Sequence, residues 1–253
     1  MNTNNWINQI YDHCKKVYSQ TYQDGIIEYI FKNIGTTNKF CVEFGFNSNS
    51  LTGGSGANVA RLVLEDNWKA LLLDGFNDNS SINLHKEFLT QKNICSIFKK
   101  YCIPKNFDYI SIDVDSIDLW LFKAMLEGEF RPRLISIEYN ANFDLDMSIT
   151  VKEGTIWKNG DAVYGASLLA LNKVAEEFDY CLIAAIEKYD LFFIRKELLN
   201  NYVSKLSDFQ KFVGLPTHCE YGMPSTKRIE SFVEYPSMNP LSDCIKRKLG
   251  WIK

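Results

Sequence analysis

Acidic residues close four successive apolar runs in the first 140 residues of the chain. The runs end at Glu43, Asp74, Asp113 and Glu138. Short apolar runs separated by helix-length segments predict parallel strands that are buried on both faces. Ligands of such sheets bind beyond the carboxyl ends of the strands, so the four acids predict a binding site along one sheet edge.

The first acid, Glu43, stands before a polar, glycine-rich loop that runs through residues 46–56. Gly45 permits a sharp turn and a close approach of the backbone to a ligand. The loop amides could meet a charged group near a helix N-terminus. The loop contains neither a P-loop nor a dinucleotide fingerprint, and a flexible connection is the alternative interpretation.

The second acid, Asp74, ends the second predicted strand and follows Glu43 by about 30 residues. A carboxylate there can accept hydrogen bonds from both hydroxyls of an adenosine ribose. The alternative is an aspartate that caps a helix or a turn.

Asp113, Asp115 and Asp118 form a close acidic group after the third acidic run. Clustered carboxylates repel one another unless a cation, a proton or hydrogen-bond donors compensate. We expect Asp113 and Asp115 to face a ligand's ammonium group, act as a general base or hold a divalent ion. We expect Asp118 to cap the following helix.

The fourth run ends with Glu138, Tyr139 and Asn140, whose carboxylate, phenol and amide suit a polar acceptor molecule. A strand-end hydrogen-bond network is the alternative. His85 is a candidate base, although a lone helical histidine is more often a surface residue.

Hydrophobic periodicity predicts an alternating arrangement of helices and strands that ends in a hairpin. We expect helices at 23–34, 57–65, 95–101, 119–126 and 165–178, helical character at 81–92, strands at 40–44, 69–73, 109–113 and 134–138, a weak third strand at 92–94, a long excursion at 141–161 and a hairpin of 181–186 with 191–194. This order predicts a parallel sheet with a terminal antiparallel hairpin, which differs from the dinucleotide-binding architecture. We divide the chain into a helical segment that closes the site (1–35), a core (36–197) and a mixed C-terminal extension (198–253).

Composition restricts the compartment and the partners. The 253 residues are 46% hydrophobic and 23% charged with a net charge of −3, which argues against duplex nucleic acid as the main partner. Seven cysteines without a C-x-x-C pair predict a reducing compartment. Because no signal peptide and no membrane-length apolar run is visible, we expect a cytoplasmic protein without an integral membrane segment. The oligomeric state stays open.

The motifs together resemble class I S-adenosylmethionine-dependent methyltransferases, and more closely the FkbM-like family. The resemblance covers about residues 19–195. It is carried by Ser19-Gln20-Thr21-Tyr22-Gln23-Asp24-Gly25-Ile26-Ile27, Val42-Glu43-Phe44-Gly45, Leu73-Asp74-Gly75, Asn93-Ile94, the run from Phe107 to Asp115, Arg131-Pro132-Arg133, Ile137-Glu138-Tyr139-Asn140 and the run from Tyr164 to Leu171.

The resemblance implies a Rossmann-like seven-stranded α/β sheet and assigns roles to residues. Cofactor-binding residues would be Gln20, Asp24, Glu43, Gly45, Asn47, Asp74, Asn93, Ile94 and Asp113; catalytic residues would be Asp113, Asp115 and His85; and substrate-binding residues would be Glu138, Tyr139, Asn140 and Tyr164, with the loop around Trp157. The first loop departs from the family, because Asn47-Ser48 stands where relatives often carry Asp-Gly and Gly53-Gly54-Ser55-Gly56 is additional. Which loop amides contact the cofactor therefore stays open.

The resemblance also implies an activity. Relatives commonly methylate hydroxyls of sugars or secondary metabolites, which implies O-methylation of a sugar- or phosphate-linked oxygen in a capsule or surface glycan or its precursor. The cofactor would be S-adenosyl-L-methionine and the product S-adenosyl-L-homocysteine. We assign no metal ligand, although Mg²⁺ held by Asp113 or Asp115 with Glu138 is an alternative. A catalytically silent scaffold and a nucleotide-sugar or NAD enzyme are the competing functions.

Overall fold

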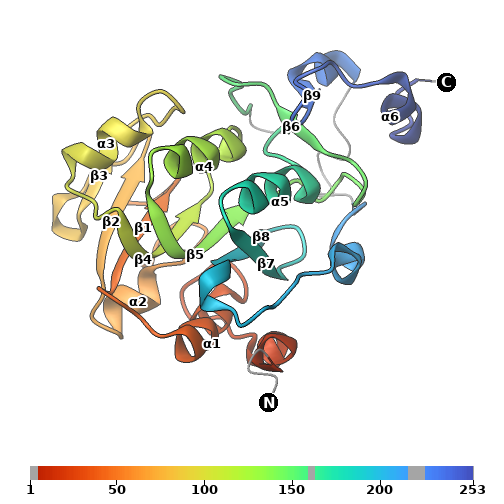
Figure 1. The fold of residues 1–253 in the computed structure, drawn as a ribbon. Coiled ribbons are helices and arrows are strands. Elements are labelled where there is room, and N and C mark those ends of the chain that lie inside the picture. The colour runs from red at the N-terminus through yellow and green to blue at the C-terminus, as the bar shows by residue number, and fades with distance from the viewer. Residues whose placement is uncertain (1–4, 159–162, 216–225, 253) are drawn as a thin grey trace.

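The computed structural model describes residues 5–158, 163–215 and 226–252, and one mixed sheet organises them (Figure 1). Its strand order is β3-β2-β1-β4-β5-β8-β7. Five strands are parallel: β1 (Phe40–Phe44), β2 (Lys69–Asp74), β3 (Leu84–Lys86), β4 (Asn106–Ile112) and β5 (Arg131–Glu138). β8 (Asp190–Arg195) runs antiparallel to β5, and β7 (Tyr180–Ala185) runs antiparallel to β8. The predicted seven-stranded sheet with its terminal antiparallel hairpin is thus confirmed.

Helices cover both faces of the sheet, because alternate strand residues point to opposite faces and nearly all of them are apolar. α1 (Gln23–Ile34) and α2 (Ala60–Leu64) lie on the face that includes Cys41 and Leu72. The opposite face, which includes Val42 and Leu71, carries α3 (Ile94–Lys100), α4 (Asp118–Glu127) and α5 (Leu168–Glu177). The predicted helix at 23–34 has these same bounds.

The N-terminal and C-terminal parts add to this core. A 3-10 helix, η1 (Asn5–His13), packs against α1 and buries Ile7 and Ile10. A second sheet pairs β6 (Ile149–Val151) with β9 (Phe232–Glu234) in antiparallel register. The remaining elements are η2 (Ser80–Ile82), η3 (Lys196–Leu198), η4 (Leu206–Phe212), η5 (Thr226–Ser231) and α6 (Asp243–Lys248). Across the described ranges, no helix is long and apolar enough to cross a membrane.

The predictions for the third strand and its preceding helix are wrong. The edge strand is β3, whose Leu84 pairs with Leu72, and not the segment 92–94, where Asn93 directly precedes α3. The predicted helix at 81–92 does not form because Asn79 accepts hydrogen bonds from Ser81 and Asn83 adopts a left-handed φ of 54°, which turns the chain into β3. Such side chain-to-backbone bonds compete with helix formation.

The predicted excursion at 141–161 contains β6, which periodicity did not reveal. Its partner β9 lies about 80 residues further along the chain, so only tertiary pairing defines it. Trp120 of α4 donates its indole N–H to the carbonyl of Val151 at 2.8 Å and thereby fastens β6 to the core.

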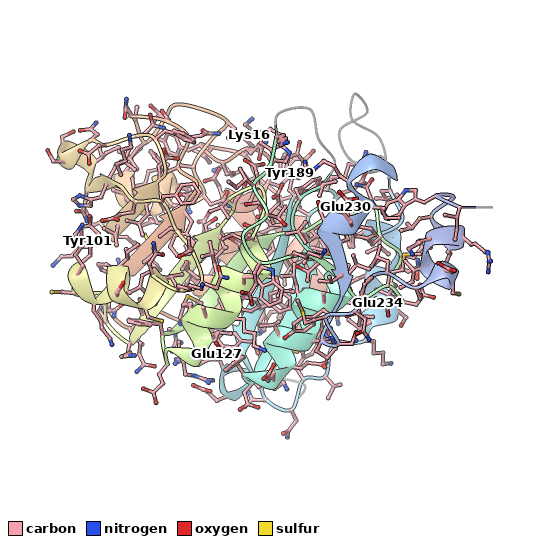
Figure 2. All side chains as sticks on the ribbon, turned by 90° about the horizontal axis from the view of Figure 1, so that it is seen from above. Lys16, Tyr101, Glu127, Tyr189, Glu230 and Glu234 are labelled. Carbon is pink, nitrogen blue, oxygen red and sulfur yellow. The ribbon has the colours of Figure 1, made fainter. Side chains whose placement is uncertain are left out.

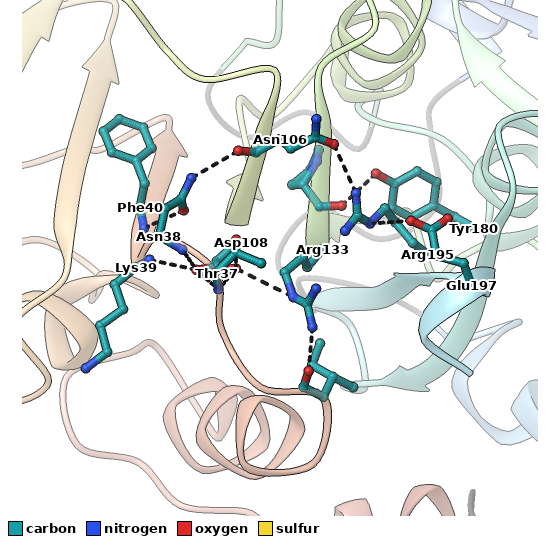
Figure 3. A network of polar contacts seen from close by, with 12 residues as sticks. Thr37, Asn38, Lys39, Phe40, Asn106, Asp108, Arg133, Tyr180, Arg195 and Glu197 are labelled. Atoms are coloured by element: carbon teal, nitrogen blue, oxygen red, sulfur yellow. Dashed lines mark hydrogen bonds and ion pairs between the residues drawn. The ribbon is translucent and has the colours of Figure 1, made fainter. Parts of the chain in front are cut away.

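The buried acid Asp108, whose charge is met by backbone N–H groups and a guanidinium, connects the elements at the amino end of the sheet (Figure 3). Asp108 of β4 is fully buried and accepts the backbone N–H groups of Thr37, Asn38 and Lys39 at 2.7–2.9 Å. The guanidinium of Arg133 lies 3.6 Å from its carboxylate. These bonds tie the connection between α1 and β1 to the central strands.

We expect Asp108→Ala to lower the free energy of unfolding by about 3–5 kcal/mol, because it leaves Arg133 and three amides without their buried acceptor. Urea unfolding of the variant and of the wild type measures the difference. Asp208→Ala, which removes an exposed aspartate from η4, is the matched control and should change stability by about 0.5 kcal/mol or less. A loss below about 1 kcal/mol for Asp108→Ala would contradict this account.

Candidate functional site

Gly45 makes the turn that ends β1, and only glycine fits there. Its φ is +68°, and a Cβ at this position would lie 1.6 Å from the carbonyl oxygen of Asp113. Its N–H donates to the carbonyl of Leu73 at 3.1 Å. The turn therefore brings the carboxyl ends of β1, β2 and β4 together, as the sequence predicts.

Glu43, two residues before Gly45, binds the backbone that follows the glycine-rich loop. Its two carboxylate oxygens accept the backbone N–H groups of Asn58 at 2.9 Å and Val59 at 3.1 Å, just before α2 begins. The side chain is 7% exposed. Burial is the main cause that raises the pKa of Glu43 to about 7; the two amide bonds act against it, and the charges of Asp190 and Asp24 act with it. Glu43 thus holds the glycine-rich loop against the sheet.

The glycine-rich loop closes on itself and on the N-terminal segment. Asn47 donates to the hydroxyl of Ser55 at 3.1 Å and accepts the N–H of Ser55 at 3.4 Å. A Cβ on Gly56 would lie 2.6 Å from the carbonyl oxygen of Tyr18 and 2.7 Å from the nitrogen of Gln20. The loop therefore packs directly against the segment that carries Gln20.

Asp24, at the start of α1, orders this N-terminal segment. Its Oδ2 accepts the N–H groups of Val17, Tyr18 and Ser19 at 2.7–2.9 Å and the hydroxyl of Ser19 at 2.6 Å. Its Oδ1 is buried and has no hydrogen-bond partner among the described residues. Oδ2 therefore takes all the hydrogen bonds that the described residues donate to this carboxylate.

Asp74 is the last residue of β2 and is 6% exposed. One of its two carboxylate oxygens accepts all of its hydrogen bonds from the described residues. Oδ1 accepts the N–H groups of Phe76 at 2.7 Å and Asn77 at 2.6 Å, and the Asn77 amide at 3.0 Å. Two aromatic side chains near this turn are exposed, Phe76 by 83% and Phe88 by 62%. Sequence reasoning missed them, although Phe76 follows the predicted Asp74-Gly75 turn directly.

Asn93 and Ile94 lie at the start of α3. The Asn93 side chain accepts the N–H of Thr90 at 2.8 Å and donates to the carbonyl of Phe88 at 2.9 Å. Ile94 is fully buried. These bonds give Asn93 a role in shaping the loop that carries Phe88.

A row of polar side chains crosses the sheet on the α1 face. Glu43, Ser111 and Ser136 are paired across β1, β4 and β5, so their side chains share this face. The Asn58 amide donates to Ser111 at 2.9 Å, and Ser136 donates to Ser111 at 3.2 Å. Such a row is unusual inside a buried sheet, where apolar residues are expected.

Asp190 joins this row from the hairpin. Because β8 is antiparallel, its first residue lies at the edge where the parallel strands end, and it pairs with Glu138. Its carboxylate accepts the Gln23 amide at 2.8 Å, and burial raises its pKa to about 6. Sequence reasoning missed Asp190, although it follows the turn of the predicted hairpin.

Three carboxylates come close together at the end of β4 and β5. One oxygen each of Asp113, Asp118 and Glu138 lies within 4.8 Å of the other two. Burial raises the pKa of Asp118 to about 7 and the pKa values of Asp113 and Glu138 well above the usual range, and the neighbouring carboxylates add to each shift. Asp115 is exposed and has a left-handed φ of 58°, which breaks the strand geometry that would align it with Asp113. Asp118, and not Asp115, therefore completes the group.

The expected capping role of Asp118 takes a different form. It is the first residue of α4, and its carboxylate accepts the N–H groups of Val114 at 2.8 Å and Ser116 at 3.0 Å from the preceding loop. The bonds therefore fix the loop after β4 and not the first amides of the helix.

Tyr139 and Asn140, two of the predicted acceptor-binding residues, form hydrogen bonds with other parts of the protein. Tyr139 is fully buried and donates to the carbonyl of Phe212 at 2.7 Å, on the face away from the polar row. Asn140 donates to the carbonyl of Tyr164 at 2.9 Å and accepts the N–H of Asn142 at 3.1 Å. The structure thus brings Asn140 and Tyr164 together beside Glu138 and turns the Tyr139 side chain away.

His85 lies apart from the acidic group. It belongs to β3, which β2 and β1 separate from β4. Its ring stacks on Tyr101 with centroids 4.4 Å apart and hydrogen-bonds to Asn83 at 2.9 Å. In Figure 2, Tyr101 lies at one end of the molecule and Tyr189, the neighbour of Asp190, lies far from it. The structure therefore does not place His85 where it could act as the base.

Comparison with known proteins adds fold-level likenesses. No protein-family model matches the sequence, and the search of curated proteins found no match. Among solved structures, the chain is similar to the MycE methyltransferase of the mycinamycin biosynthetic pathway in complex with Mg, SAH and mycinamycin VI, with a TM-score of 0.45 and 13% identity over 81% of this chain. It spans 57% of the length of MycE. It is also similar to a SAM-dependent methyltransferase from Aquifex aeolicus, with a TM-score of 0.33 and 12% identity over 74% of this chain and 96% of the other.

We expect Gly45→Ala to destabilise the protein more than Gly35→Ala does. Both glycines have a φ of +68°, but no atom lies within 4 Å of a Cβ on Gly35. Gly35→Ala should therefore lower the free energy of unfolding by about 1–2 kcal/mol from the backbone conformation alone. Gly45→Ala should lose about 1–3 kcal/mol more, since the Asp113 carbonyl must move. Equal losses in denaturant unfolding would contradict the close approach.

Glu43 should make the stability of the ligand-free protein depend on pH. Its folded pKa of about 7 exceeds the ordinary 4.5, so the folded state holds a proton that the unfolded state releases. The free energy of unfolding should therefore fall as pH rises from about 4.5 to about 7, by up to roughly 3 kcal/mol from this group. Asp24 and Asp190 face Glu43 and strengthen the effect.

Glu43→Gln should remove this part of the pH dependence, so the variant should gain stability relative to the wild type across the same window. Thermal or urea unfolding at several pH values measures the gain. Glu176→Gln, at an exposed position of α5, is the control and should follow the wild-type curve. Parallel curves for the wild type and Glu43→Gln would refute the assigned pKa shift.

Proposed function

We propose that the chain is an S-adenosylmethionine-dependent methyltransferase whose cofactor lies across the carboxyl ends of β2, β1 and β4. The observation that carries the proposal is that the Gly45 turn meets Leu73, the residue before Asp74, on one side and Asp113 on the other. A glycine turn lets an elongated ligand approach the backbone, and an acid at the end of the next strand suits ribose hydroxyls. The sheet with its antiparallel hairpin supports the same function.

The bonds of Asp74 support its role on the ribose. Oδ1 is occupied by the turn that follows β2, so we assign Oδ2 to the ribose hydroxyls. The exposed ring of Phe76 is available to cover the adenine, which would remove apolar surface from water. The buried Oδ1 of Asp24 and the segment with Gln20 would meet the amino acid part of the cofactor from the α1 side.

We further propose that the acceptor is a neutral hydroxyl, such as a sugar hydroxyl in a capsule or surface glycan or its precursor. The acids around Asp113 would repel an anionic acceptor, which argues against the phosphate-linked oxygen that the sequence left open. None of the ion pairs within the described ranges places Lys, Arg or His on Asp113, Asp118, Glu138 or Asp190. In the described part of the chain, an anion would therefore lack an ion-paired basic residue at these acids to receive it.

In the proposed reaction, the bound cofactor supplies a methyl group on a positively charged sulfur. With that cofactor bound, the acceptor oxygen would form a bond to the methyl carbon as the carbon–sulfur bond breaks, and the electron pair of that bond would stay on the sulfur. The acceptor proton passes to a carboxylate, Asp113 or Asp115. A raised pKa makes Asp113 a stronger base than an ordinary aspartate, and positioning by the turn at Gly45 contributes the rest.

The two competing functions differ in measurable ways. A nucleotide-sugar or NAD enzyme would favour parallel final strands and a glycine fingerprint, whereas β8 and β7 are antiparallel. A silent scaffold would bind the cofactor without transferring its methyl group. Titration calorimetry against S-adenosylhomocysteine and NAD, followed by incubation of labelled S-adenosylmethionine with sugar acceptors, separates the three.

We expect Asp74→Ala to weaken S-adenosylhomocysteine binding by on the order of 1.5–3 kcal/mol, which is about 10- to 150-fold, because the ribose loses charge-assisted hydrogen bonds. Calorimetry on the folded variant measures the change. Asp78→Ala, which removes a nearby exposed acid, is the control and should retain affinity. Unchanged affinity in Asp74→Ala would disprove the ribose assignment, and stabilisation of the wild type by NAD alone would disprove the proposed function.

A further inference from the structure

Three carboxylates converge at the acceptor side of the proposed methyl position, and each comes from a different element. Asp113 follows β4, Asp118 begins α4 and Glu138 ends β5. One oxygen from each lies within 4.8 Å of the other two. Asp118 is fully buried and the other two are half-buried, so three negative charges this close require compensation.

The protein supplies little of that compensation. Asp118 accepts two backbone N–H groups, from Val114 and Ser116. Glu138 differs, since its Oε2 atom is buried and accepts no hydrogen bond from the described residues. A buried carboxylate oxygen without a donor is costly, which indicates that something absent from the polypeptide meets it.

The geometry points to a cation. A cation 2.0–2.6 Å from each oxygen places these oxygens roughly 3–5 Å apart, which agrees with the 4.8 Å limit of the group. The set contains only carboxylate oxygens, the ligands that hard divalent cations favour over nitrogen and sulfur. Three ligands would leave further positions on the cation for water or for an acceptor oxygen.

We propose that Asp113, Asp118 and Glu138 form a binding site for a hard divalent cation, with Mg²⁺ or Mn²⁺ as its occupant. The role of the cation rests on the proposed function: it would take the acceptor hydroxyl oxygen as a further ligand and lower the pKa of that hydroxyl. Asp113 is then a ligand, and the exposed Asp115 at the rim receives the proton. The sequence suggested Asp115 as a ligand, whereas the fold places Asp118 in the group.

Mn²⁺ binding to the full chain, stripped of metal with EDTA and then dialysed, tests the site directly. Electron paramagnetic resonance measures free Mn²⁺ during the titration, and Mg²⁺ serves as the competitor. We expect one saturable Mn²⁺ site that Mg²⁺ displaces, and an affinity at least tenfold weaker in Glu138→Gln. Asp208→Asn, at an exposed acid on η4, should bind Mn²⁺ as the wild type does.

A second variant, Asp113→Asn, and a second ligand, S-adenosylhomocysteine, separate failure of the cation site from failure of folding and from failure of the proposed function. Asp113→Asn should also weaken Mn²⁺ binding at least tenfold, so a folding failure of one variant does not end the test. Absence of saturable Mn²⁺ binding by the folded wild type, or equal binding by Glu138→Gln, would overturn the proposal and assign the compensation to protons. S-adenosylhomocysteine binding in EDTA, measured on the same samples, reports on the proposed function alone, because that ligand is not expected to contact the cation.

Discussion

A group of acids that the described residues pair with no cation is the constraint on which the site depends. Glu43, Asp113, Asp118, Glu138 and Asp190 lie along the edge where the parallel strands end, and burial raises the pKa of each. Asp108, at the opposite end of β4, shows how the same fold treats a structural acid. It faces Arg133 and a row of backbone amides, and the helix–strand connection folds around it (Figure 3). Among the described residues no cation pairs with the site acids in this way, which makes their edge receptive to a positively charged ligand.

The topology concentrates this charge. The parallel strands end at a common edge, and the antiparallel β8 begins there, so Asp190 lies beside Glu138 although their strands run in opposite directions. Ser111 and Ser136 continue the polar row across the α1 face between Glu43 and Asp190. The N-terminal segment closes this face through Asp24 and through the contact of Gly56 with Tyr18. A hairpin, a glycine loop and a helix start thus contribute to one site.

The acidic edge lowers the stability of the ligand-free fold and favours the binding of positively charged ligands. Each buried acid with a raised pKa lowers the stability of the ligand-free protein near neutral pH, and a cation that binds only the folded state restores it by mass action. A sulfonium cofactor carries positive charge into the site, and a divalent cation would carry more. Both proposed ligands, the sulfonium cofactor and the divalent cation, would bring positive charge to the same acids. The proposed preference for a neutral acceptor hydroxyl follows from the negative charge of these acids as well.

The sequence by itself determined the sheet, its terminal hairpin and the positions of Glu43, Gly45, Asp74, Asp113 and Glu138 at strand ends, because buried strands and sharp turns leave strong local patterns. Local pattern could not determine β3, whose three residues are too few for periodicity, or β6, whose partner is distant in the chain. It also could not separate Asp115 from Asp118, since a left-handed residue turns one outward and the start of α4 brings the other in. Tertiary structure alone placed Asp190 in the site, removed His85 from it and turned the Tyr139 phenol into the core, because these outcomes depend on strand order and on which face of the sheet each side chain occupies.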